Sequence, residues 1–299
     1  MKLRAGDGVL LVAHGTVTNL DDLPGFLARI RHGRPASPEL LADLRRRYEA
    51  VGGSPLLEIT RAQASALASR LDLPVLVGMR LWEPSVEDAL RGAAHLGIKR
   101  LVVLPLAPFS VAVYWQAAQS SLESVRSELG ASAPELVPVP AWGEDPAFVA
   151  AHAAAIRTIS ADLPGAELLL SAHSLPLVAI RSGDRYQSEV EACARAIGAR
   201  LNRDYRVVYQ SQGADGGEWL GPDLRAELRG LREQGKNHVV LAPFGFLADH
   251  VETLYDLDVE ARGWAEELGL RLLRVPALNT DEIFIGALAN VAERALANC

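Results

Sequence analysis

The order of apolar and amphipathic segments constrains the fold of this chain more than any other feature. Eight short runs rich in Val, Leu and Ala alternate with segments whose apolar residues recur at helical spacing. Runs that are apolar throughout are typical of strands buried on both faces of a parallel sheet. The predicted strands are Gly8–His14, Pro74–Leu81, Arg100–Leu106, Glu135–Ala141, Glu167–His173, Tyr205–Gln210, His238–Ala242 and Leu270–Ala277. Helices are expected between them, over Pro38–Ala50, Ile59–Leu71, Val86–Leu96, Trp115–Leu129, Asp184–Leu201 and Pro222–Gln234.

The predicted elements occur in the same order twice along the chain. Leu10–Gly15 resembles Leu169–Ser174, and each is an apolar run that ends in a histidine and a turn. Later positions repeat as well: Val102–Leu104 and Ala107–Phe109 resemble Val239–Leu241 and Ala242–Phe244, and Pro140, Asp145 and Phe148 recur 136 residues later as Pro276, Asp281 and Phe284.

This repetition predicts two similar α/β domains, over residues 1–140 and 141–280, each with four parallel strands flanked by helices. A final helix over residues 281–299 either packs back on the first domain or stays on the second. Open α/β sheets bind their ligands beyond the carboxyl ends of the strands. We therefore expect a cleft between the two domains, lined by those strand ends.

Composition excludes several classes of protein. The 299 residues carry a net charge of −7 without a clustered basic excess, so no nucleic-acid partner is expected. The two cysteines, Cys193 and Cys299, are too few for a disulfide framework or a four-thiolate metal site. No apolar stretch is long enough to span a bilayer, and no signal-peptide pattern opens the chain. A cytoplasmic location follows as the expectation, and peripheral membrane contact at the lip of the cleft stays open.

Four acidic residues follow the predicted strand His238–Ala242. Asp249, Glu252, Asp256 and Glu260 are spaced three, four and four residues apart, which places their carboxylates on one face of a predicted α-helix. Like charges at this spacing repel one another, so a bound cation would stabilise them. A solvated helix face is the alternative interpretation. The position after a strand end favours a function that handles cations.

His173 differs from the other histidines because it ends a predicted buried strand at the expected cleft. A neutral imidazole there accepts a proton near neutral pH or binds a metal ion. Together with Glu252 it would form a histidine–carboxylate site suited to either task. No role is assigned to His95, His152 or His238, which fall in helices or at helix–strand edges.

Five motifs follow one another along the second half of the chain: Ser171–Pro176, Gly183–Tyr186, Gln210–Gly213, Trp219–Pro222 and Gly245–Glu260. On these residues the chain resembles ferrochelatases, the enzymes that insert ferrous iron into a porphyrin at the end of haem synthesis. The resemblance covers nearly the whole chain and implies two Rossmann-like, chelatase-like domains around a porphyrin cleft.

The resemblance also implies the roles of individual residues. His173 and Glu252 match the family's catalytic and metal-binding pair, and Asp256 and Glu260 match acids that guide metal ions or protons. The N-terminal half is most similar to the short bacterial branch, which includes enzymes that use coproporphyrin. His14 stands where that branch commonly has a tyrosine, and could ligate the iron of the product. The residues implied to contact the porphyrin are His14, Arg31, Arg47, Tyr48, Ser54 and Tyr114.

The implied reaction is insertion of Fe²⁺ into protoporphyrin IX or coproporphyrin III with release of two protons. Porphyrin, ferrous iron and haem product are then the expected partners, with no cofactor beyond the substrate metal. The [2Fe–2S] cluster of some relatives needs four cysteines, which this chain does not have. Two alternatives stay open: a non-catalytic haem or tetrapyrrole carrier with His14 as axial ligand, and a chelatase for another metal such as cobalt.

Overall fold

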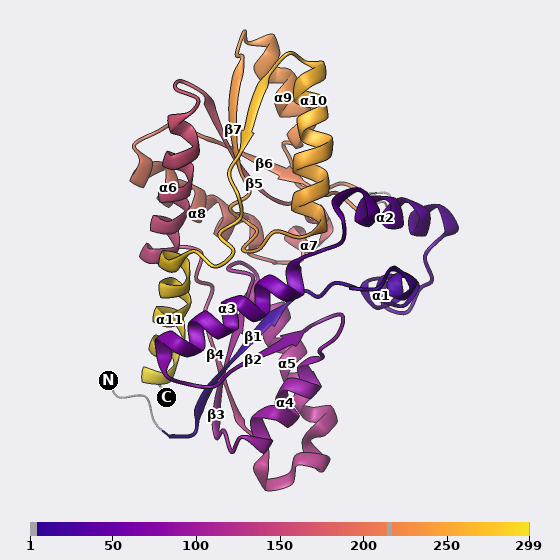
Figure 1. Ribbon diagram of the computed structural model, residues 1–299, viewed down its shortest axis with the longest axis vertical. Coiled ribbons are helices and arrows are strands. Elements are labelled where there is room, and N and C mark those ends of the chain that lie inside the picture. Colours follow the sequence, from indigo (N-terminus) through magenta and orange to yellow (C-terminus); the bar gives the residue numbers. More distant parts are fainter. Residues whose placement is uncertain (1–4, 214–216, 299) are drawn as a thin grey trace. The chain divides into compact units, whose positions relative to one another are not determined.

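The computed structural model describes residues 5–213 and 217–298, which form two compact units (Figure 1). Unit 1 contains the chain up to Trp142 and the C-terminal segment from Phe284, and unit 2 contains Gly143–Ile283. Each unit is built on its own four-stranded sheet. The cleft expected between the two domains stays a prediction.

The sheet of unit 1 is parallel throughout, in the order β2-β1-β3-β4. All seven residues of β1 are buried, as a central strand covered on both faces requires. The strands are β1 (Asp7–Ala13), β2 (Val75–Met79), β3 (Arg100–Pro105) and β4 (Glu135–Pro138).

Helices cover this sheet because one stripe of each is apolar. Leu10 and Val103 on the sheet form a core with Leu90 of α4 and Leu122 of α5. The helices of unit 1, whether or not they lie on the sheet, are α1 (Leu23–Ile30), α2 (Pro38–Val51), α3 (Leu56–Leu71), α4 (Val86–His95), α5 (Val111–Leu129) and α11 (Glu282–Ala297), with short 3₁₀ turns η1 (Leu20–Asp22) and η2 (Gly130–Ser132).

The C-terminal helix α11 belongs to unit 1. The ring of Phe284 stacks on Trp142 with centroids 6.5 Å apart, and Gly286 lies against the guanidinium of Arg70 in α3. Ten residues of α11 are buried, so it contributes to the core of this unit.

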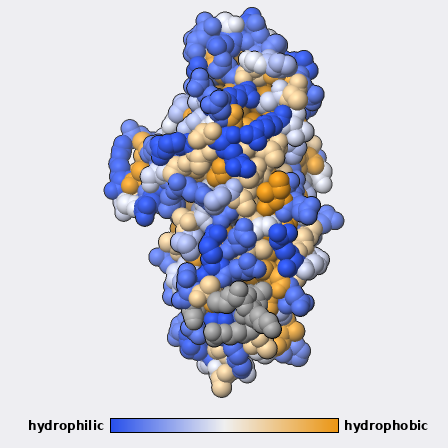
Figure 2. Space-filling model, turned by 90° about the vertical axis from the view of Figure 1, so that its left-hand side faces the viewer, coloured by the Kyte–Doolittle hydropathy of each residue, from blue (hydrophilic) through white to orange (hydrophobic). Residues whose placement is uncertain are grey.

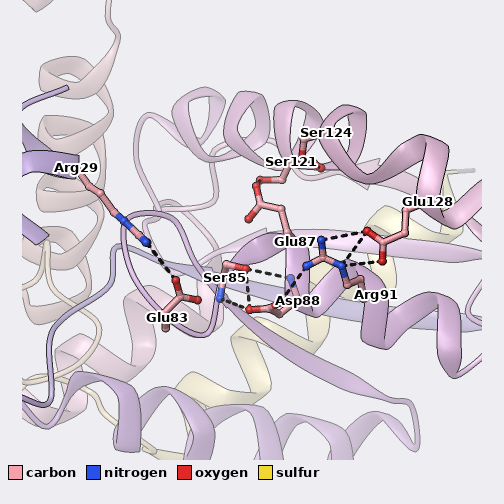
Figure 3. Close-up of polar contacts among 9 residues, drawn as sticks. All are labelled: Arg29, Glu83, Ser85, Glu87, Asp88, Arg91, Ser121, Ser124 and Glu128. Carbon is pink, nitrogen blue, oxygen red and sulfur yellow. Dashed lines mark hydrogen bonds and ion pairs between the residues drawn. The ribbon is translucent and has the colours of Figure 1, made fainter. Parts of the chain in front are cut away.

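Polar contacts fix the start of α4 and its neighbour α5 (Figure 3). Ser85 and Asp88 form a capping box, in which each side chain accepts a hydrogen bond from the backbone N–H of the other residue. Arg91 joins Asp88 at 3.0 Å and Glu128 of α5 at 2.9 Å. These ion pairs are exposed and contribute little to stability, but the cap defines where the helix begins.

The sheet of unit 2 repeats the arrangement of the first. Its order is β6-β5-β7-β8, again parallel throughout, with the first strand of the unit in the same inner position. The repeat in the sequence therefore corresponds to a repeat in topology. The strands are β5 (Glu167–His173), β6 (Arg206–Gln210), β7 (His238–Ala242) and β8 (Arg271–Arg274).

Two groups of helices flank the second sheet (Figure 1). Leu169 and Leu241 pack with Leu228 of α9 and with Leu257 and Ala265 of the segment that follows β7. The elements of this unit are α6 (Pro146–Ala161), α7 (Leu177–Arg181), α8 (Tyr186–Leu201), α9 (Leu224–Glu233), the π-helix η3 (Thr253–Ala261) and α10 (Arg262–Glu267).

The eight predicted strands are present, and the last strands of each unit are shorter than expected. The predicted strand Leu270–Ala277 is reduced to Arg271–Arg274, and Glu135–Ala141 to Glu135–Pro138. The apolar residues beyond each strand still contribute to the core, since Val139 and Val275 are buried. An apolar run thus marks burial, whereas the strand itself ends where the ladder of hydrogen bonds ends.

Within the described part of the chain, no helix is both long and apolar enough to cross a membrane. On the face that Figure 2 shows, hydrophilic residues predominate and hydrophobic residues form separate small patches.

We expect His152 to make the stability of unit 2 dependent on pH. Its ring is buried in α6 edge-on to Phe148, and its Nε2 has no hydrogen-bond partner among the described residues. Burial lowers the pKa of His152 to about 3 from its ordinary value of 6.5. Between these values the unfolded chain binds a proton that the folded chain does not. The free energy of unfolding should therefore fall as pH decreases, and at pH 5 it should be roughly 2 kcal/mol lower than at pH 7.5.

Urea unfolding of wild type and His152→Leu at pH 7.5 and pH 5 measures this contribution. The difference between the two pH values should be smaller in the variant, because leucine does not titrate. His95→Leu, at an exposed position of α4, is the matched control and should keep the wild-type difference. An unchanged pH dependence in His152→Leu would contradict the assignment.

Candidate active site

A histidine–carboxylate pair lies at the carboxyl end of the sheet in unit 2. His173 is the last residue of β5, and its Nδ1 lies 3.4 Å from Oε2 of Glu252. Nε2 of His250 lies 3.7 Å from the same oxygen. The structure thus brings together the two residues expected from the sequence and adds a second imidazole. Side chains of His173 and Glu252 remain 35% and 40% exposed, so a ligand can reach them.

A glycine allows this close approach. The backbone of Gly245, in the turn after β7, lies directly against β5, where a Cβ would stand 2.9 Å from Cβ of Ala172 and 3.0 Å from its Cα. Any side chain would push the turn away from the strand that carries His173. The next residue, Phe246, then places its ring edge-on to His173, with centroids 6.4 Å apart, and 5.1 Å from the ring of His250. The turn therefore positions both imidazoles.

The charges of this pair depend on each other. Burial raises the pKa of Glu252, but the neighbouring imidazoles of His173 and His250 outweigh it and hold that pKa well below its usual value. Burial lowers the pKa of His173, yet the charges of Glu252 and Asp256 outweigh it and leave that pKa raised. Glu252 is consequently ionised at neutral pH, and a proton on His173 is stabilised by it.

The acidic segment differs from the predicted α-helix in two respects. Thr253–Ala261 is a π-helix, a rare conformation that is frequent at functional sites. Its hydrogen bonds span five residues instead of four, which widens the turn and keeps residues four apart near one face. Asp249, by contrast, lies before the helix, so the prediction that it shares the acidic face is wrong.

Asp249 instead takes part in a partly buried ion-pair network. Its Oδ1 lies 2.8 Å from Nη1 of Arg274, and Oδ2 accepts a hydrogen bond from Nδ2 of Asn279 at 2.9 Å. Nε and Nη2 of the same arginine bind the carboxylate of Asp258, each at 2.8 Å. Arg274 therefore ties the loop before the π-helix to the helix itself. The sequence spacing could not show this, because the arginine comes from β8.

Thr253 orients the second imidazole. Its hydroxyl oxygen is fully buried, accepts the backbone N–H of His250 at 2.9 Å and lies 3.4 Å from Nδ1 of that residue. The same hydroxyl donates to Oδ1 of Asp249 at 3.3 Å. The network thereby holds His250 with Nε2 toward Glu252.

Of the two further acids, Asp256 is 6% exposed, and its carboxylate accepts a hydrogen bond from the hydroxyl of Ser211, just beyond β6. Ser211 has a left-handed backbone, with φ of 60°, and was not singled out as a site residue from the sequence. Its place immediately after a strand end is the signal that could have found it. Glu260 lies one further turn along the π-helix and is partly buried.

Unit 1 gathers several of the expected porphyrin-contact residues at the carboxyl end of its own sheet. His14 follows β1 and is exposed, while Tyr114 lies at the start of α5. Tyr48 is only 1% exposed, and its hydroxyl is 2.8 Å from that of Thr16, in the turn after His14. Tyr48 thus holds the turn that follows His14 through its contact with Thr16.

The remaining expected contacts lie on or beside helices α1 and α2. Arg31 ends α1 and is partly buried. Nε of Arg47 donates to Oδ2 of Asp43 at 2.7 Å, one turn earlier in α2. The hydroxyl of Ser54, in the turn after α2, is buried without a hydrogen-bond partner among the described residues. These positions were expected from the resemblance alone.

Among the residues that the structure describes, no group of three or more His, Cys, Asp and Glu side chains is arranged to hold a metal ion. His173 and Glu252 offer one nitrogen and one carboxylate, a donor set that suits Fe²⁺, Zn²⁺ or Co²⁺ with open positions remaining. Such a pair fits a metal that passes through as a substrate.

Solved structures share this fold. SirB from Bacillus subtilis with Fe³⁺ matches with a TM-score of 0.65 and 14% identity, over 98% of this chain and 97% of that one. CbiX, the terminal enzyme for siroheme biosynthesis in denitrifying bacteria, matches with a TM-score of 0.55 and 17% identity, over 96% and 99%. At 14% and 17% identity these matches establish that the fold is shared.

Sequence relatives specify the family. Residues 6–296 match the family Ferrochelatase. The chain is 39% identical to a ferrochelatase of Deinococcus radiodurans, over 96% of this chain and 95% of that protein. It is 37% identical to a coproporphyrin III ferrochelatase of Geobacillus thermodenitrificans, over 97% and 96%. The chain belongs to the ferrochelatase family, and it is an enzyme that inserts Fe²⁺ into a porphyrin in haem biosynthesis.

Proposed function

We propose that His173 accepts protons from the porphyrin and, with Glu252, holds the incoming Fe²⁺. The observation that carries this proposal is the contact of 3.4 Å between the imidazole and the carboxylate at an exposed strand end. Two pyrrole N–H protons must leave before the metal is bound by all four nitrogens. An imidazole beside an ionised carboxylate can take such a proton, and the carboxylate stabilises the imidazolium that forms.

The same pair can then coordinate the metal once the imidazole is neutral. A planar porphyrin points its nitrogen lone pairs inward, so a hydrated cation reaches them only if the ring is bent. Binding energy from the rest of the macrocycle supports that distortion. Within unit 2, Phe246 and Thr253 hold the two imidazoles around Glu252 and so limit the motion of the carboxylate.

Asp256 and Glu260 extend the acidic groups along the π-helix, and we assign them to the path of metal ions inward or protons outward. Ser211 fixes the carboxylate of Asp256 by its hydrogen bond. A buried acid held in one orientation suits transfer to a neighbouring group. Glu260, which is more exposed, would exchange with solvent.

Unit 1 would supply the porphyrin contacts. His14, Arg31, Arg47, Ser54 and Tyr114 are assigned to the macrocycle or its carboxylates, and guanidinium groups suit carboxylates through paired hydrogen bonds. For Tyr48 the burial under the His14 turn supports a positioning role. His14 is also proposed as an axial ligand of the product iron, in place of the tyrosine common in short bacterial relatives.

The porphyrin is protoporphyrin IX or coproporphyrin III, since relatives of similar identity include both plain ferrochelatases and coproporphyrin III ferrochelatases. An anaerobic insertion assay with Fe²⁺, which follows porphyrin absorbance with each substrate in parallel, decides between them. Faster turnover of one would identify the substrate. Stoichiometric haem binding without turnover of either would instead support a carrier.

The same assay tests the remaining expectations about partners. Purified protein with porphyrin and Fe²⁺ alone should form haem product, because we propose that no further cofactor is needed. Replacement of Fe²⁺ by Co²⁺ or Zn²⁺ would measure the metal preference, which a histidine–carboxylate pair does not define. The cytoplasmic location stays a prediction, which cell fractionation would test.

A further inference from the structure

Arg80 lies at the carboxyl end of the sheet in unit 1, directly after β2. Its backbone N–H donates to the carbonyl of Ala13 at 2.8 Å, and the next residue, Leu81, donates to the carbonyl of His14 at 3.0 Å. The arginine therefore neighbours the turn that carries His14. Parallel α/β sheets bind their ligands beyond this edge, so the position is one where a side chain meets a ligand.

The side chain of Arg80 is partly buried, and within residues 5–213 and 217–298 it has no counter-ion. Its Cζ lies 5.6 Å from the centroid of the Tyr114 ring, a cation–π contact that holds the planar guanidinium in place. Nε is buried and forms no hydrogen bond, and no carboxylate pairs with this arginine in the part of the chain that the structure describes.

Other arginines of unit 1 do have carboxylate partners. Arg100 binds Asp7 at 2.8 Å, and Arg29 faces Glu83 at 3.3 Å (Figure 3). A partly desolvated cation without a partner is unfavourable, and an anion that arrives with a ligand would relieve the cost. The rigid fork of a guanidinium matches a carboxylate with two parallel hydrogen bonds.

We propose that Arg80 binds one carboxylate of the porphyrin substrate, with Tyr114 supporting its guanidinium. This inference rests on the proposed function, in which Tyr114 contacts the same macrocycle. It adds a residue that the resemblance did not imply. Arg80 differs in this respect from Arg47, because the guanidinium of Arg47 already forms an ion pair with Asp43.

Fluorescence quenching of coproporphyrin III and protoporphyrin IX measures the porphyrin Kd of wild type, Arg80→Met and Arg80→Lys. A charge-assisted hydrogen bond is worth about 1.5–3 kcal/mol, so Arg80→Met should raise Kd roughly 10- to 100-fold for at least one of the two porphyrins. Arg80→Lys keeps the charge and the aliphatic stem but loses the fork, and its Kd should rise less. In steady-state assays, Arg80→Met should raise the KM for porphyrin by a larger factor than it lowers kcat.

Esterification provides the specific control. The dimethyl ester of protoporphyrin IX, supplied in detergent, has no ionised carboxylate, and its Kd should be similar in wild type and Arg80→Met. Arg126→Met, at an exposed position in α5 where the arginine pairs with Glu123, should change neither Kd. Circular dichroism confirms the fold of each variant, and Arg80→Lys carries the test if Arg80→Met is unfolded.

Unchanged Kd values for both free-acid porphyrins in the Arg80 variants would overturn the inference. An equal loss for the diester would do the same, because it would show a role in packing. In either case an active wild type would leave the proposed function standing. If wild-type protein inserted Fe²⁺ into neither porphyrin, the proposed function itself would fail.

Discussion

Replacement of His173 by alanine should reduce the kcat of iron insertion by roughly 10²- to 10⁴-fold, the usual contribution of a general acid–base group. The same change removes one of the two proposed metal donors, so the loss should not be recovered at high Fe²⁺ concentration. Porphyrin Kd should remain near that of wild type, because the residue belongs to unit 2 and not to the proposed porphyrin contacts. The backbone should also stay in place, since its carbonyl accepts a hydrogen bond from the hydroxyl of Tyr186 at 2.9 Å.

Anaerobic single-turnover assays with porphyrin quenching on the same samples test this expectation. His95→Ala, at an exposed helical position of unit 1, is the matched control and should retain wild-type kcat. Loss of porphyrin binding together with activity would indicate a structural role for His173. Retention of activity would remove it from the reaction altogether.

Replacement of Arg274 by alanine should lower the free energy of unfolding of unit 2 by about 3–5 kcal/mol, the usual loss when one partner of a buried ion pair is removed. Only 11% of the arginine side chain is exposed, and it binds Asp249 and Asp258 simultaneously. Without it, two poorly solvated carboxylates remain close together. Because Asp249 immediately precedes His250, activity should also decrease.

Chemical denaturation followed by circular dichroism measures the loss. Arg271→Ala removes an exposed arginine from the same strand and should change the free energy of unfolding little. The triple variant Arg274→Met, Asp249→Asn, Asp258→Asn removes all three charges and should recover part of the stability. A decrease in Arg274→Ala no larger than in Arg271→Ala would show that water already solvates the two aspartates.

Much of the fold could be predicted because it depends on the period and order of apolar residues. Each predicted strand lies where an apolar run is flanked by helical patterns, and Glu167–His173 and His238–Ala242 match the observed bounds. The repeated motifs also predicted two sheets of the same kind. The π-helix could not be predicted in this way. Over a few turns, the same spacing of side chains is compatible with the i→i+4 hydrogen bonds of an α-helix and with the i→i+5 hydrogen bonds of a π-helix.

The candidate site, too, could be predicted from the sequence only in part. His173 and Glu252 could be named from the sequence, because a strand end and the motifs that follow it indicate where ligands bind. The sequence by itself determined the repeat, the parallel strands and the chemical types at their ends, since these depend on residues close together in the chain. Only the tertiary structure decided that Asp249 forms an ion pair with Arg274, and that His250 as well as His173 contacts the carboxylate of Glu252. It also decided that Tyr48 is buried against the turn that follows His14, and that Arg80 has no carboxylate partner among the residues that the structure describes. Such pairings depend on which distant segments fold against one another, and local spacing carries no information about that.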